Sequence, residues 1–209
     1  MPNQKTIQWI TDAIPGRVRG GFVSEDELLD ELQERIEDEV EDPSPELLAE
    51  VQALVSLSFA EHQKEEINWR ERTVNDAIDA AFETLNRQGI VALQNAGYTM
   101  SEGWGEVNEM ADSLETAPRG AIFYHGQDLE RGVAGHGLML TFGAYEEDEA
   151  KHEAASLQIA RETREVLSQY GVVTSWDETI GQRIVIPPFH WRKRHLTQAP
   201  ESFQAARLP

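Results

Sequence analysis

Cysteine is absent from all 209 residues. Without a thiol the chain has no disulfide framework, no zinc site built on thiolates and no cysteine nucleophile. A metal site here would therefore rely on histidine nitrogens and carboxylate oxygens, the usual nitrogen and oxygen ligands of zinc or iron. The chain holds six histidines and 38 acidic residues.

Basic residues are scarce, with 18 lysines and arginines against 38 acids and a formal net charge of -20. Nucleic acids and anionic membrane surfaces are bound through basic patches. We therefore expect neither nucleic acid nor membrane as a partner. A surface this negative is suited instead to a basic protein.

Long apolar runs are also missing. Nothing approaches the roughly 20 apolar residues of a membrane-spanning helix, and the opening MPNQKTIQWITDAIPGRVRGG lacks the apolar core of a signal peptide. We therefore expect a cytoplasmic protein. At 40% hydrophobic residues the chain can still bury a good-sized core.

Residues 1–68 predict an acidic helical region. Thr6–Ile14 predicts a short helix that Pro15 ends, and a capping box at Ser24 begins a longer helix that runs to about Glu41. After a proline-rich turn, a third helix from Pro45 is expected to reach Glu66. The two long helices should pack as an antiparallel hairpin.

Residues 69–196 predict an α+β domain, followed by a loosely ordered tail at 197–209. Short apolar runs bounded by glycine or turn residues indicate a mixed sheet of about five strands, with helices packed mainly on one face. The expected strands are Ile90–Leu93, Ala121–Tyr124, Gly137–Phe142, Val172–Trp176 and Arg183–Ile186. A basic cluster, Arg192 to Arg194, is expected to neutralise acids of the N-terminal hairpin or of a neighbouring subunit.

The stretch from Gly120 to Ala144 carries the most site-like pattern. If its two strands pair in antiparallel fashion, His125 at the end of one and His136 at the start of the other would lie close together, with Asp128 between them. This arrangement fits a zinc or iron site or an acid/base cluster. In the alternative, Asp128 caps a short helix and the histidines bond to backbone. The further candidate ligand contacts are Tyr124, Gln127 and Trp104.

The run YHGQD, followed by ERGVAGHGLMLTFGA, resembles a family of bacterial proteins catalogued as a domain of unknown function. AFETLNRQGIVALQNAGYTMSEGW and IVIPPFHWRKR extend the resemblance over roughly residues 17 to 195. It implies shared ancestry and fold, and it brings no activity. Some members carry cysteines after the strand that corresponds to Ile90–Ala96. This chain has Tyr98, Thr99 and Met100 there, so a thiolate site is excluded.

No sequence motif here names a reaction. The chain lacks a G-x-S-x-G elbow, a P-loop, a dinucleotide-binding glycine fingerprint and H-E-x-x-H. We therefore expect a non-catalytic binding or regulatory protein without a cofactor, whose acidic hairpin contacts a basic protein or a second copy of the chain. One alternative is a metal-dependent or acid/base enzyme, or a small-ligand binder, with its site at the ends of the central strands. Another is an immunity protein against a basic toxin.

Overall fold

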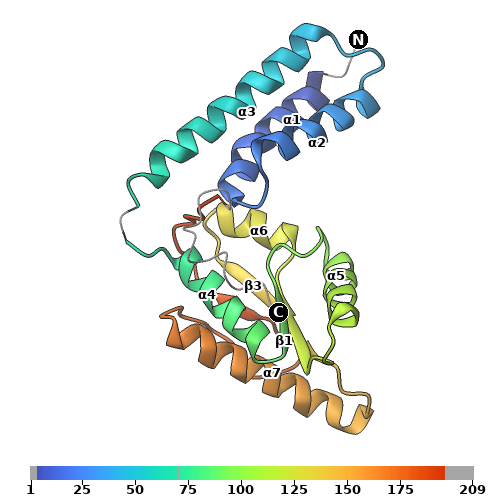
Figure 1. Cartoon of the computed structure of the whole chain (residues 1–209), viewed down its shortest axis with the longest axis vertical. Helices are drawn as coiled ribbons and strands as arrows, with labels where there is room; N and C mark the ends of the chain where they lie inside the picture. Colours follow the sequence, from blue (N-terminus) through green and yellow to red (C-terminus); the bar gives the residue numbers. More distant parts are fainter. Residues whose placement is uncertain (1–3, 70, 196–209) are drawn as a thin grey trace. The chain divides into compact units, whose positions relative to one another are not determined.

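The computed structural model describes residues 4–69 and 71–195 and divides the chain into two units. The helical unit comprises residues 1–71 and 192–209, and the sheet unit comprises residues 72–191 (Figure 1). The chain therefore passes from the helical unit to the sheet unit after Glu71 and returns after Trp191. The predicted tail, 197–209, lies outside the described residues.

Three helices form the helical unit: α1 (Gln4–Gly20), α2 (Glu25–Glu39) and α3 (Pro45–Glu66). The predicted capping box at Ser24 is confirmed. Ser24 and Glu27 make a capping box at the start of α2, and the hydroxyl of Ser44 accepts the Leu47 N–H at 3.2 Å. The apolar stripes of all three helices meet in one core, made by Ile10, Ile14, Val18, Leu28, Leu32, Ile36, Val40, Val51, Val55 and Phe59.

Helix α1 continues through Pro15 to Gly20, so the predicted end at Pro15 is wrong. Proline removes one hydrogen bond from a helix interior, but this loss is a local effect that tertiary packing overrides. Ile10, Ile14 and Val18 keep helical spacing across the proline, and all three are buried. Burial of this continuous stripe holds the helix together.

The sheet unit contains a mixed four-stranded sheet in the order β1 (Ile90–Leu93), β2 (Gly120–Phe123), β3 (Leu138–Ala144) and β4 (Ile184–Ile186). The first two strands are parallel, and the other neighbouring pairs are antiparallel. The fold is α+β, as predicted.

The described residues form four strands, and the predicted fifth strand at Val172–Trp176 is absent. Within it only Ser175 pairs with β4, through two hydrogen bonds with Val185 of 2.8 and 2.9 Å. Val172 is buried and Val173 is 72% exposed, but neither residue is paired with a neighbouring strand. One bridged residue does not extend the ladder into a strand.

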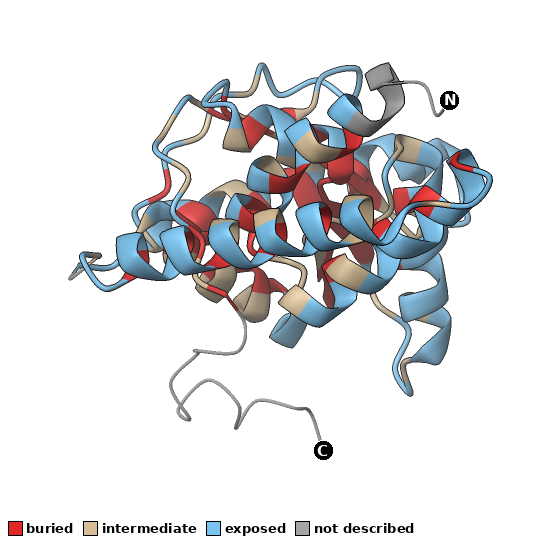
Figure 2. Ribbon diagram, turned by 90° about the horizontal axis from the view of Figure 1, so that it is seen from above, coloured by how far each residue is buried: buried red, intermediate tan, exposed pale blue. Residues whose placement is uncertain are grey.

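Four helices pack on this sheet: α4 (Val74–Arg87), α5 (Met100–Ser113), α6 (Gly126–Val133) and α7 (Glu149–Gln169). Helices α4 and α7 touch each other and the strands, whereas α5 packs on β1 and β2 through a separate cluster that includes Val91, Val107 and Phe123. Helices thus cover both faces of β1 and β2, which corrects the prediction of mainly one face. Buried and exposed residues alternate along the helices in Figure 2.

None of the helices in the described part of the chain combines the length and the apolar character that a membrane span requires.

Candidate functional site

The two central strands, β2 and β3, are antiparallel neighbours, as the predicted site requires. Their register pairs Phe123 with Thr141, so β2 ends two residues before His125 while β3 begins two residues after His136. Helix α6 fills the connection between the two histidines. His136 is exposed, and the structure does not place it with His125 and Asp128 in a metal-binding group.

His125 and Asp128 are both buried and do meet, and the partly exposed Arg183 joins them. Nε2 of His125 lies 3.1 Å from Oδ2 of Asp128, and Arg183 from β4's N-terminal flank donates to the same oxygen at 2.8 Å. His125 stands at the N-cap position of α6 without a side-chain cap bond, and its Nδ1 is buried without a hydrogen-bond partner. The acid/base role predicted for this pair stays a prediction.

Tyr124 is buried and belongs to a different, partly buried network, between the sheet and α4. Its hydroxyl donates to Gln94 at 3.0 Å, and the Gln94 amide donates to Asp79 at 2.8 Å. Burial raises the pKa of Tyr124 well above its ordinary value, and the nearby charge of Asp79 adds to the effect. Gln127 is exposed on α6.

Trp104 lies on α5 and packs against the sheet. Its ring meets Phe123 edge-on at 5.1 Å between centroids, and a Cβ placed at Gly143 would lie 2.7 Å from the indole. Gly103 beside it touches the same Phe123 ring. These contacts assign the glycine-flanked tryptophan to helix-on-sheet packing.

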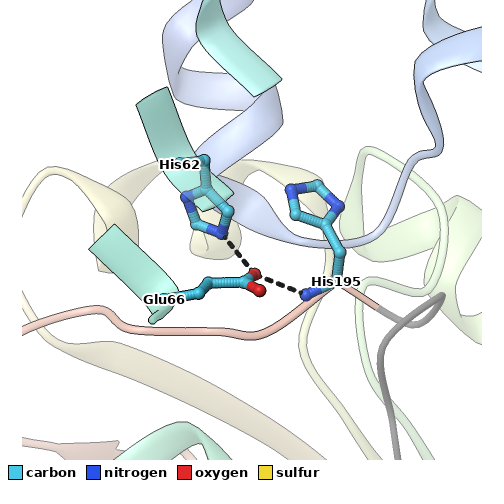
Figure 3. A group of neighbouring side chains, drawn as sticks. All are labelled: His62, Glu66 and His195. Atoms are coloured by element: carbon cyan, nitrogen blue, oxygen red, sulfur yellow. Dashed lines mark hydrogen bonds and ion pairs between the residues drawn. The ribbon is translucent and has the colours of Figure 1, made fainter. Parts of the chain in front are cut away.

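The structure brings together a second group, which the sequence reasoning missed. His62 and Glu66 lie one turn apart on α3, and Nε2 of His62 is 3.0 Å from Oε1 of Glu66. His195, which the returning chain carries back to the helical unit, donates its backbone N–H to the same oxygen at 2.9 Å. The imidazole of His195 stands beside that of His62, with 4.6 Å between ring centroids (Figure 3).

All three residues are buried, with exposed fractions of 4% for His62, 7% for Glu66 and 6% for His195. Nδ1 of His62 and Nε2 of His195 are buried without a hydrogen-bond partner. Burial lowers the pKa of His195, and the neighbouring His62 lowers it further. The neutral imidazole is therefore favoured at His195, and neutral imidazole is the form that binds metals.

Aromatic rings enclose the group. Phe59 lies 4.8 Å from the His195 ring, and Trp69 meets the His62 ring edge-on at 5.4 Å. The carbonyl oxygen of Lys193 lies 3.1 Å from Nε2 of His62 and adds one more oxygen atom of the kind that ligates metals beside the group. The surroundings are closed and largely apolar, which strengthens electrostatic interactions inside.

The donor set fits a transition metal. Ligand atoms of His62, Glu66 and His195 all lie within 4.8 Å of one another, and no other set of three in the described residues does so. Zinc ligands at 2.0 to 2.1 Å in a tetrahedron stand about 3.4 Å apart. No two of the three ligand atoms are therefore farther apart than this zinc spacing by more than about 1.5 Å.

One sequence signal does mark two of these residues. The buried stripe of α3 runs through Val51, Val55 and Phe59, and its next positions are His62 and Glu66. A histidine and a glutamate in place of apolar residues on a core stripe indicate buried polar groups that need partners. His195 has no such pattern, because it follows the last strand in a segment without periodicity.

A family model described as "Domain of unknown function (DUF6891)" matches residues 3–195. The chain belongs to this family. Membership was predicted from the central motif, and the match extends over both units and includes His62, Glu66 and His195. No curated protein and no solved structure matches the chain.

Proposed function

We propose that the protein binds one divalent transition-metal ion through His62, Glu66 and His195. The observation that carries this proposal is the closeness of three buried ligand atoms, all within 4.8 Å of one another, in a group where Nε2 of His195 has no hydrogen-bond partner. A buried nitrogen left unpaired costs about 1–3 kcal/mol. Coordination supplies the missing partner.

In the alternative, the same residues form a hydrogen-bonded contact between α3 and the segment that contains His195, without a metal. Glu66 accepts the His195 N–H, and Nε2 of His62 donates to the Lys193 carbonyl. That reading accounts for the backbone contacts but leaves the imidazole of His195 turned toward His62 with an unused nitrogen. Metal binding at Nε2 of His62 would replace its proton, as coordination by histidine requires.

The donor types narrow the class of metal. Two imidazole nitrogens and one carboxylate oxygen suit zinc or ferrous iron, and the absence of thiolate argues against copper(I). Structural zinc sites are closed, whereas catalytic sites keep one position open to solvent. The low exposure of all three ligands therefore favours a structural ion.

Metal analysis tests the proposal. The full chain without a histidine tag is purified and its zinc and iron are measured by mass spectrometry, before and after chelation and zinc titration. We expect about one equivalent in the wild type and a loss of at least about tenfold in affinity in His62→Ala and His195→Ala, since each removes one of three ligands. Wild-type protein that binds neither ion would contradict the proposal.

Two matched histidine variants locate the ion. His136→Ala removes an exposed imidazole and His125→Ala removes the buried one beside Asp128. Both are expected to keep the metal while they stay folded by circular dichroism. Loss of the ion in His125→Ala, with retention in His62→Ala, would move the site to the end of β2.

The surface of α2 favours a second candidate function, the binding of a basic protein. Its acids face solvent, and Arg17 pairs with Glu31 among them. Neutralising three exposed acids, as in E34Q/D38N/E39Q, is expected to weaken capture of such a partner and to make the complex less sensitive to salt. A partner captured equally by wild type and variant would exclude this surface.

A further inference from the structure

The segment Arg192 to His195 packs in the helical unit, although it follows the sheet unit in the sequence. Its backbone is bonded at two points, from His62 to the Lys193 carbonyl and from the His195 N–H to Glu66. The guanidinium of Arg194 donates to the carbonyl of Trp69 at 2.7 Å. The end of α3 and Trp69, just after it, therefore contact three consecutive residues of this segment.

Lys193 is the most deeply buried residue of the segment, with 3% of its surface exposed. Its ammonium lies 4.6 Å from the centre of the Phe22 ring, and its stem passes Gly21. Gly21 has a φ of +80°, and a Cβ there would lie 2.8 Å from Cγ of Lys193. The turn after α1 is shaped to accept this lysine.

The candidate metal ligands come from both sides of this contact. His62 and Glu66 belong to α3, and His195 belongs to the segment. An ion held by all three residues binds the docked segment and not the released one. By linkage, free metal at 100 times its dissociation constant multiplies the ratio of docked to released segment by about 100.

We propose that metal occupancy controls the docking of residues 192–195 on α3, an inference that rests on the proposed metal site. With the ion bound, the helical unit holds both chain crossings, after Glu71 and after Trp191. When the ion is withdrawn, the segment is retained by hydrogen bonds and side-chain packing alone. Release frees the chain that follows Trp191 from the end of α3.

Trypsin reports directly on the docked state. The segment offers three successive cleavage sites, after Arg192, Lys193 and Arg194, and cleavage there removes the C-terminus as a fragment seen by mass spectrometry. Opening that is fast relative to cleavage makes the rate follow the population of released segment. Zinc chloride at 100 times its dissociation constant is therefore expected to slow this cleavage about 100-fold relative to chelator-treated protein.

Cleavage after Lys151 serves as the internal reference, since its side chain is 70% exposed on α7 in the sheet unit. Its rate should be the same with and without zinc. His195→Ala should lose the zinc effect on the segment, and so should Glu66→Gln, which keeps the shape of the side chain. His190→Ala removes an exposed imidazole nearby and should keep the full effect.

The outcomes separate the two proposals. Zinc bound at one equivalent with an unchanged rate of segment cleavage overturns the docking inference and leaves the metal site standing. No bound zinc overturns both. Bound zinc that slows the wild type and His190→Ala, but not His195→Ala or Glu66→Gln, establishes the metal-controlled segment.

Discussion

Oε1 of Glu66 accepts the backbone N–H of His195 at 2.9 Å across 129 positions of sequence. The same oxygen lies 3.0 Å from His62 Nε2, so one buried carboxylate joins a helix to the returning chain. Carboxylates are rarely buried unless their oxygens are matched by donors. The position of Glu66 at the end of a core stripe is explained by these two contacts.

Replacing Glu66 with leucine is expected to lower the free energy of unfolding. The change leaves the His195 N–H and Nε2 of His62 without this acceptor in a buried place, which costs about 1–3 kcal/mol. The measurement is urea unfolding of metal-free protein followed by circular dichroism. Glu65→Leu, at an exposed neighbouring position, should stay within about 0.5 kcal/mol of wild type. Equal stability of both variants would contradict a structural role for Glu66.

The two glycines of α5 should respond to alanine in opposite directions. At Gly103 a Cβ would lie 2.4 Å from the Phe123 ring and 2.9 Å from the Ala96 carbonyl, so Gly103→Ala is expected to destabilise by about 1–3 kcal/mol. At Gly105 nothing lies within 4 Å, and Gly105→Ala should stabilise by up to about 1 kcal/mol through helix propensity. Thermal unfolding of the pair tests this, and a stabilised Gly103→Ala would refute the tight contact.

Local patterns were sufficient to predict much of this fold. The capping box at Ser24, the long helices α2 and α3, and the four strands that formed all depend on residues near one another in sequence. The errors have tertiary causes. Because Ile14 and Val18 are buried, α1 stays helical beyond Pro15. Val173 is exposed and does not join the sheet.

Local sequence patterns predicted less of the candidate site than of the fold. The predicted site required antiparallel pairing of β2 and β3, and the two strands do pair in this way, but the register and the intervening α6 put His136 on the surface. His62 and Glu66 could have been recognised as polar residues on a buried stripe. Their association with His195 depends on the return of the chain to the helical unit, which no local pattern encodes.

Asp128 should contribute more to stability than a residue of an exposed ion pair with the same contact distance. Its carboxylate is 4% exposed, lies 2.8 Å from Arg183 and is also bonded to His125. Asp128→Ala leaves both partners unmatched and is expected to cost about 2–4 kcal/mol. The exposed pair of Lys151 and Asp148 also measures 2.8 Å, yet Lys151→Ala should change stability by less than about 0.5 kcal/mol. Urea unfolding of both variants would refute the burial argument if their effects were equal.

The ion pair between Arg119 and Glu162 predicts a dependence of stability on pH. Two hydrogen bonds, of 3.1 and 2.7 Å, join the guanidinium to the carboxylate, and they lower the pKa of Glu162 against an opposing effect of burial. A carboxylate with a lower pKa in the folded state stabilises the fold above its unfolded pKa of about 4.3. That contribution is lost as the pH falls through the folded pKa, when Glu162 becomes protonated.

Glu162→Gln should therefore be less stable than wild type at pH 7 and equal to it at about pH 2. Because half of the Arg119 side chain is exposed, solvent screening keeps the difference below about 1 kcal/mol, and added salt should reduce it. Urea midpoints of both proteins at several pH values measure the difference. Glu153→Gln, at an exposed position of the same helix, controls for the loss of one negative charge. If Glu162→Gln trailed wild type by the same margin at pH 2 as at pH 7, the loss would arise from packing, and the charge of Glu162 would have no part in it.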